Sequence, residues 1–169
     1  MNFPIPAILG TLILSATAQQ PTATPPAKPV HIAELASCPE PVRRTLASLL
    51  PKPIISEILL TTSGNRKIYS FETGTEDDGT DRETTYTIEA DGTLLRTTRE
   101  IPFKDAPEPV RKAFQDAAGR TAKVDDVEEV TSGTDITYRA ELESDGAEDR
   151  RITVSPNGTV ISLTPETDD

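Results

Sequence analysis

The chain has 169 residues and a formal net charge of −11 at neutral pH. Such a charge repels nucleic-acid phosphates and anionic lipid headgroups, so we expect no nucleic-acid partner. Cys38 is the single cysteine, which excludes an intramolecular disulfide. A hydrophobic core or the packing of repeats must therefore hold the fold together, and the core is expected to be thin because only 4% of the residues are aromatic.

Residues 1–18 have the pattern of a signal peptide. An apolar run over about residues 5–14 is followed by Ala16, Thr17 and Ala18, which form an A-x-A cleavage pattern, although no Lys or Arg precedes the run. The run is too short to span a bilayer, which takes ~20 residues. We therefore expect an acidic periplasmic or extracellular protein with no membrane span after the signal peptide is removed.

Residues 19–35 are expected to form a proline-rich linker, because the stretch has many prolines and no apolar periodicity. His31, the single histidine, lies near its end and is expected to be flexible and solvated rather than a base or a ligand. Cys38 is expected to be a small residue just before a helix. Lipidation, an intermolecular disulfide and a reactive thiol remain open for it, whereas a Cys38–His31 dyad is disfavoured.

The pentapeptide PEPVR occurs twice, at residues 39–43 and 107–111, which are 68 positions apart (107 − 39). After each copy the apolar residues recur at i, i+4, i+7 and i+8, a spacing that predicts one stripe of a helix. Proline is tolerated at a helix start because its missing N–H would have no partner there. The two stripes, which predict matching helices, are Val42, Leu46, Leu49 and Leu50, and Val110, Phe114, Ala117 and Ala118.

Four strands are predicted after each helix from alternating apolar residues and turn residues. Tyr69 and Tyr138 occupy matching places, and the Asp-Gly and Asn-Gly pairs that end at Gly92 and Gly158 predict hairpins. In such two-residue turns both residues take positive φ. The residues that mark the duplication are Val42, Leu46, Tyr69, Gly92, Val110, Phe114, Tyr138 and Gly158.

The predicted fold class is α+β, with two tandem αββββ units over residues 36–101 and 102–166. Each unit is expected to be a helix packed on a four-stranded antiparallel sheet. A unit of this size buries only about 60% of its unfolded surface and is marginal alone. The two sheets are therefore expected to join side by side or to share an interface.

The second half resembles the PepSY-like family of exported bacterial domains. The resemblance lies in "EPVRKAFQDAAGRTAKVDDVEEVTSGTDITYRAEL" and "ITVSPNGTVISL", which contain a Y-x-x-E strand at Tyr138 and Glu141. The first half matches with Tyr69 and Glu72 but departs at "PKPIISEILL", which lacks the A-K pair of the family pattern. The matching stretch covers about residues 38–165.

The resemblance implies a fold similar to the tandem-domain beta-lactamase inhibitory protein and to protease propeptide domains. It implies binding in the periplasm or outside the cell, often suggested to be inhibitory. It implies no catalytic residues, and the sequence shows neither a phosphate-binding glycine loop nor a G-x-S-x-G motif.

The loop "TGTEDDGTDRE" is rich in carboxylates, which are the ligands that hard cations prefer. Because the spacing of an EF-hand is absent, we interpret the loop as a solvated hairpin tip, with weak calcium binding as the alternative. The candidate ligands are Glu76, Asp77, Asp78 and Asp81. No cofactor is expected.

The sequence therefore predicts an exported, non-enzymatic binding module that presents a sheet and acidic loops to an unknown protein in the cell envelope or extracellular space. One alternative is an inhibitor of a secreted or periplasmic hydrolase, either a protease or a beta-lactamase. Another is a weak calcium-responsive sensor.

Overall fold

The computed structural model describes residues 27–77, 80–144 and 148–166, and among these it describes the backbone but not the side chains of residues 75–77, 80 and 81. The predicted signal peptide and residues 19–26 of the predicted linker lie outside the described residues. Both remain predictions.

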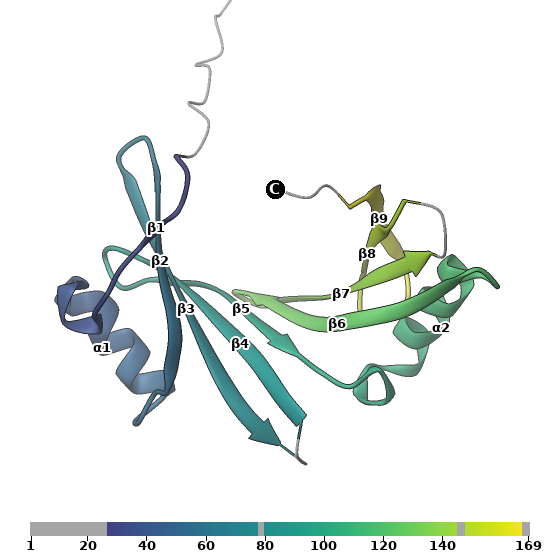
Figure 1. The fold of residues 1–169 in the computed structure, drawn as a ribbon, viewed down its shortest axis with the longest axis horizontal. Helices are drawn as coiled ribbons and strands as arrows, with labels where there is room; N and C mark the ends of the chain where they lie inside the picture. Colours follow the sequence, from purple (N-terminus) through teal and green to yellow (C-terminus); the bar gives the residue numbers. More distant parts are fainter. Residues whose placement is uncertain (1–26, 78–79, 145–147, 167–169) are drawn as a thin grey trace, which may run out of the picture.

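Within the described residues the chain forms one antiparallel sheet whose nine strands follow in sequence order (Figure 1). Two helices and two short 3-10 turns accompany the sheet: η1 (Leu35–Ser37), α1 (Glu40–Leu49), η2 (Phe103–Asp105) and α2 (Glu108–Ala118). The strands are β1 (Val30–His31), β2 (Ile55–Ser63), β3 (Arg66–Asp77), β4 (Thr80–Glu89), β5 (Leu94–Glu100), β6 (Ala122–Ser132), β7 (Asp135–Ser144), β8 (Arg150–Val154) and β9 (Val160–Pro165).

The predicted fold class of two tandem αββββ units is wrong, because the strands do not form two four-stranded sheets. Residues 97–100 of β5 pair with residues 128–131 of β6 and make the sheet continuous. Residues 30–31, expected in a linker, add β1 to the edge of β2. Pairing β5 with β6 satisfies backbone N–H and C=O groups that two separate sheets would leave at exposed edges.

Both helices cover the same face of the sheet, near its opposite ends (Figure 1). One row of cross-strand partners shows this, because it joins a strand beneath α1 to a strand beneath α2. The row consists of Thr73, Thr84, Arg99, Glu129, Tyr138 and Val154. Side chains in a single row point to the same side of a sheet.

The helices begin where the PEPVR pentapeptides predict. Pro39 and Pro107 are the N-cap residues, and each helix carries a further proline in its first turn. Gly119 follows α2 with a φ of 66°, a conformation that glycine adopts without steric cost.

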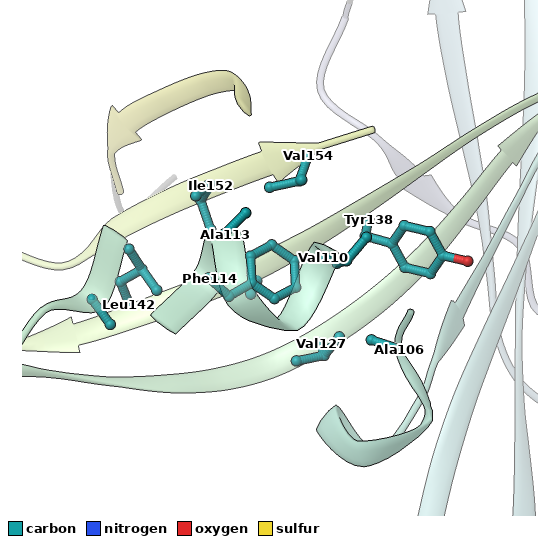
Figure 2. Close-up of a cluster of buried hydrophobic side chains, with 11 residues drawn as sticks. Ala106, Val110, Ala113, Phe114, Val127, Tyr138, Leu142, Ile152 and Val154 are labelled. Carbon is teal, nitrogen blue, oxygen red and sulfur yellow. The ribbon is translucent and has the colours of Figure 1, made fainter. Parts of the chain in front are cut away.

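Each helix packs on its own half of the sheet and encloses its own hydrophobic cluster. The cluster under α1 contains Cys38, Val42, Leu46, Ile58, Tyr69, Phe71 and Ile88. The cluster under α2 contains Ala106, Val110, Ala113, Phe114, Ala118, Val127, Tyr138, Ala140, Leu142, Ile152 and Val154 (Figure 2).

The two clusters place their phenylalanine on different elements. Under α1 the helix contributes Leu46 and the strand contributes Phe71, whereas under α2 the helix contributes Phe114 and the strand contributes Ala140. Phe71 and Ala140 hold matching places, two residues after Tyr69 and Tyr138. A large side chain opposite a small one fills each core to a similar depth, because packing depends on the summed volume.

The hairpin turns at Gly92 and Gly158 differ from the predicted two-residue turns. Only the glycines have positive φ, 93° and 86°, while the Asp and Asn before them do not. The backbone N–H of Glu89 donates to the carbonyl of Thr93 at 2.9 Å, which closes a three-residue loop, and Ser155 with Thr159 repeats the pattern. In this loop a left-handed glycine follows an ordinary turn, so one positive φ suffices.

These two glycines also lie against the helices. A Cβ atom at Gly92 would be 2.9 Å from the carbonyl oxygen of Pro41, and one at Gly158 would be 2.7 Å from that of Pro109. The β4–β5 turn therefore touches the first turn of α1, and the β8–β9 turn touches the first turn of α2. Only a residue without a side chain fits at either contact.

We predict that Gly158→Ala lowers the free energy of unfolding by about 2–3 kcal/mol, because it combines a positive φ with a clash against helix backbone. Gly133→Ala is the matched control: Gly133 has a φ of 60°, but a Cβ atom added there would have no heavy atom within 4 Å. The control should cost only about 1 kcal/mol. Chemical denaturation measures both, and equal losses would show that the contact with α2 contributes nothing.

Candidate functional site

The sheet face opposite the helices, here called the open face, is covered by no helix within the described part of the chain. The two Y-x-x-E stretches define it, because residues three apart on a strand point to opposite faces. Tyr69 and Tyr138 are buried in the two clusters. Glu72 and Glu141 therefore point to the open face.

Six glutamates, here called the carboxylate cluster, lie on the open face: Glu57, Glu72, Glu83, Glu100, Glu128 and Glu141. Glu57 stands directly opposite Glu72 on the neighbouring strand, and Glu100 stands directly opposite Glu128. The backbone N–H of Glu83 donates to Oε2 of Glu100 at 3.0 Å. Carboxylates thus follow one another across β4, β5 and β6.

Three basic side chains lie against the cluster: Arg139, Arg151 and His31. Arg139 lies opposite Glu128, with its Nη2 3.0 Å from Oε2 of Glu128. Nδ1 of His31 lies 3.1 Å from Oε1 of Glu57. Arg151 stands directly opposite Glu141 and also pairs with Glu166. These three side chains do not balance the charge of six carboxylates.

The pKa values of three members are raised. Burial is the main cause of the raised pKa of Glu83, and the charges of Glu72, Glu100 and Glu57 add to it. Burial also raises the pKa of Glu128, against the opposing effect of Arg139. The pKa of Glu141 is raised by burial and then by Glu166 and Asp126. At neutral pH the ionised forms of these three glutamates therefore oppose folding.

A β-bulge shapes the sheet beside the cluster. The register of β6 shifts between Asp125 and Glu128, and Asp126 in this bulge has a φ of 44°. The extra residue turns Val127 into the core under α2. A hollow of about 120 Å³ lies there, with charged lining residues Glu100, Asp126, Glu128, Arg139, Glu141 and Arg151.

On the helix side, the junction of β5 and β6 is held by a polar group. Nη2 of Arg99 lies 2.9 Å from Oε1 of Glu129, and the Tyr138 hydroxyl donates to Oε2 of Glu129 at 3.1 Å. Figure 2 shows the Tyr138 hydroxyl pointing away from the aliphatic side chains. These contacts tie β5 of the first half to β6 and β7 of the second.

The residues that mark the predicted duplication are distributed evenly between the halves. Val42, Leu46 and Tyr69 lie under α1, and Val110, Phe114 and Tyr138 lie under α2. Gly92 and Gly158 occupy the two turns described above. Whether one unit was copied remains a prediction.

His31 and Cys38 lie apart from the carboxylate cluster's centre. His31 belongs to β1, so its backbone is paired rather than flexible as expected, while its side chain is 76% exposed. Cys38 is buried in the cluster under α1. Burial raises the pKa of its thiol, with Arg43 acting in the opposite direction, and a raised pKa favours the protonated thiol at neutral pH.

The candidate calcium ligands are not tested by this structure. Glu76, Asp77 and Asp81 lie on β3 and β4 with side chains outside the described set, and Asp78 lies outside the described residues altogether. Among the residues that are described, no group of three His, Cys, Asp or Glu side chains is arranged to hold a metal ion. Calcium binding stays a prediction.

Sequence reasoning missed Glu57, Glu100 and Glu128 as members of one surface. The signal that could have found them is the period-two alternation, because each glutamate lies one or three residues from a core-facing position of its strand. The alternation assigns each side chain to a face of the sheet, but it does not identify the residue beside it on the next strand. Glu100 and Glu128 meet only through the pairing of β5 with β6.

No protein-family model matches this sequence, and no curated protein matches it. Membership of the PepSY-like family therefore stays a prediction.

Solved structures share the fold. A DUF2874 family protein from Bacteroides ovatus has a TM-score of 0.60 and 15% identity, over 76% of this chain and 88% of that chain. A BLIP-like protein from Bacteroides fragilis has a TM-score of 0.57 and 19% identity, over 78% and 89%. A candidate periplasmic protein from Bacteroides eggerthii has a TM-score of 0.58 and 16% identity, over 76% and 88%. Likeness at these identities shows the fold alone.

Neither helix in the described part of the chain is long and apolar enough to cross a bilayer.

We predict that Glu83→Gln stabilises the protein at neutral pH by at most about 0.5 kcal/mol. The neutral amide removes the cost of partly burying a charge and the repulsion from neighbouring carboxylates, and the gain is small because solvent screens the exposed Glu83 side chain. A carboxyl whose folded pKa lies above its unfolded value binds more protons when folded, so its contribution to stability falls as pH rises between the two values. The gain should therefore shrink on acidification and vanish below about pH 4, where Glu83 is protonated in both states.

Denaturation curves from pH 3 to pH 8 measure this difference. Glu34→Gln, which changes an exposed carboxylate outside the sheet, serves as the control and should show no such gain at neutral pH. A gain for Glu83→Gln that does not depend on pH would contradict the electrostatic explanation.

Proposed function

We propose that this chain is an exported, non-enzymatic binding module of the PepSY-like type, whose open face docks onto a basic surface of a partner protein in the periplasm or outside the cell. The observation that carries the proposal is the carboxylate cluster. Six glutamates gather on a face that no described helix covers, and the basic side chains beside them, Arg139, Arg151 and His31, offset only part of their charge.

The energetics of the cluster support a binding role. Like charges directly opposite one another destabilise a sheet, and Glu57 with Glu72 and Glu100 with Glu128 are such pairs. Residues that oppose folding are typical of functional surfaces, where activity is gained at the expense of stability. Cations from a partner would relieve this repulsion on binding.

The shape of the surface also favours a macromolecular partner. A sheet presents a broad array of side chains held by backbone hydrogen bonds, and protein interfaces need roughly 800 Å² on each side. The hollow of about 120 Å³ beside Asp126 is small for an organic ligand, since ligand pockets are typically ~300–1,000 Å³. The hollows of about 320 Å³ at Glu57 and about 350 Å³ at Glu100 are larger but open at the surface. Charge complementarity would speed association and make it sensitive to salt.

A narrower form of the proposal is inhibition of an exported hydrolase. The fold shared with the BLIP-like protein of Bacteroides fragilis favours it, and an acidic face suits a basic cleft. Interface hot spots are enriched in Trp, Tyr and Arg, yet the chain has no Trp and buries Tyr69 and Tyr138. General protein binding is therefore the broader conclusion.

The test compares two immobilised variants with the unmodified protein in capture from a cell-envelope extract. The open-face variant carries Glu72→Gln, Glu83→Gln and Glu100→Gln. The control variant removes three charges elsewhere, with Glu34→Gln, Glu108→Gln and Asp116→Asn, all exposed positions outside the sheet. We expect the open-face variant to lose a captured protein that the control retains.

The captured protein is then purified and its affinity measured by calorimetry at two salt concentrations. We expect at least about a tenfold loss of affinity for the open-face variant, or about 1.4 kcal/mol, and weaker binding at higher salt. Equal capture by both variants would show that the partner does not bind at the open face.

Inhibition is tested by titrating the protein into assays of exported proteases and beta-lactamases. Loss of enzyme activity at micromolar protein is the expected result if the narrower form holds. Unchanged activity throughout would leave the broader binding function alone.

A further inference from the structure

Strand β9 ends the sheet, and no described segment pairs with its outer edge. Three of its apolar side chains are exposed: Val160 (48%), Ile161 (58%) and Leu163 (44%). From Val160 to Pro165 the strand carries no charged residue, although the chain has a net charge of −11. An uncharged, apolar edge strand is a template for pairing with another strand.

The backbone of β9 shows which groups are free. The N–H of Glu166 donates to the carbonyl of Asp149 at 2.7 Å, so this opposed pair is hydrogen-bonded. Hydrogen-bonded pairs alternate along an antiparallel ladder, and Arg150 with Pro165 and Ile152 with Leu163 are therefore non-bonded pairs. The N–H and C=O of Leu163 point away from β8, toward the outer edge.

Pro165 fits this assignment. It occupies the next position whose N–H would face outward, and proline is tolerated there because it has no N–H to leave unpaired. Leu163 is thus the centre of the edge that remains able both to donate and to accept.

The opposite edge of the sheet is different. Strand β1 has only two residues, Val30 and His31, and Lys28 and Pro29 come just before it. A short strand with lysine and proline is a common protection against edge pairing. The described residues give β9 no such lysine.

We propose that a second copy of this chain pairs with β9, antiparallel and about a twofold axis at Leu163. The N–H of Leu163 in each copy then donates to the Leu163 carbonyl of the other. The two Leu163 side chains adjoin, and Ile161 of each strand lies opposite Pro165 of the other. A closed twofold contact uses the same patch on both partners, so the association stops at a dimer.

The distribution of charge favours a second copy of the chain as the partner of β9, and it favours antiparallel over parallel pairing. Two uncharged strands approach without opposing charges, whereas a basic partner would find no carboxylate on β9. In the antiparallel arrangement the two Glu166 residues are separated by about six residues along the strands, or roughly 20 Å, which exceeds the Debye length of ~8 Å at physiological salt. A parallel pairing would place the two acidic ends side by side.

Sedimentation of the purified protein from about 1 μM to about 1 mM tests the proposal. We expect a monomer–dimer equilibrium whose dimer fraction increases with salt, because salt screens the repulsion between two acidic chains. Binding of a basic partner at the open face should weaken with salt, so the two proposals fail independently.

Substitution at the axis gives the sharper test. Leu163→Lys and Leu163→Glu should each be monomeric at concentrations where the unmodified protein dimerises, because like charges face each other across the axis. Mixing the two variants should restore a heterodimer. Ile54→Lys, which changes a 79% exposed side chain outside the strands, is the matched control and should dimerise normally.

Amide hydrogen exchange needs no variant. The Leu163 amide should exchange more slowly as protein concentration rises, because the dimer protects an N–H that is free in the monomer. A monomer throughout the concentration range would overturn the proposal. So would a dimer that Leu163→Lys leaves unchanged, or a Leu163 amide whose exchange is independent of concentration.

Discussion

The pairing of β5 with β6 is the constraint on which the rest of the structure depends. Four residue pairs, from Thr97 with Thr131 to Glu100 with Glu128, join the strands of the two halves. Because these pairs keep the side-chain alternation in phase, α1 and α2 cover the same face of the sheet. The opposite face is then free of described helices along its length, and that face carries the carboxylate cluster.

The same junction brings unfavourable charges together. In a separate first sheet Glu100 would have only Glu83 as a neighbouring carboxylate, but the pairing places it between Glu83 and Glu128. On the helix side, Arg99, Glu129 and Tyr138 form a compensated polar group. The two faces of the β5–β6 junction therefore have different roles. The helix side stabilises the connection, and the open face concentrates negative charge where a partner can reach it.

The halves keep their backbone arrangement while their side chains differ. Both place a positive-φ glycine against the first turn of a helix, and this contact allows no side chain. The largest core side chain comes from a different element in each half: Phe71 lies on a strand in the first, and Phe114 lies on a helix in the second. Backbone approach is a stricter requirement than core composition, because several sets of side chains fill the same volume.

The sequence by itself determined the local elements: the helices that begin at PEPVR, and the positions, though not the type, of the turns at Gly92 and Gly158. These depend on neighbouring residues, through helix periodicity, strand alternation and the steric freedom of glycine. Only the tertiary structure decided that the strands form one sheet, that β1 joins it, and that Glu100 faces Glu128. Strand order across the two halves depends on which edges meet, and alternation assigns a residue to a face without naming its neighbour on the next strand.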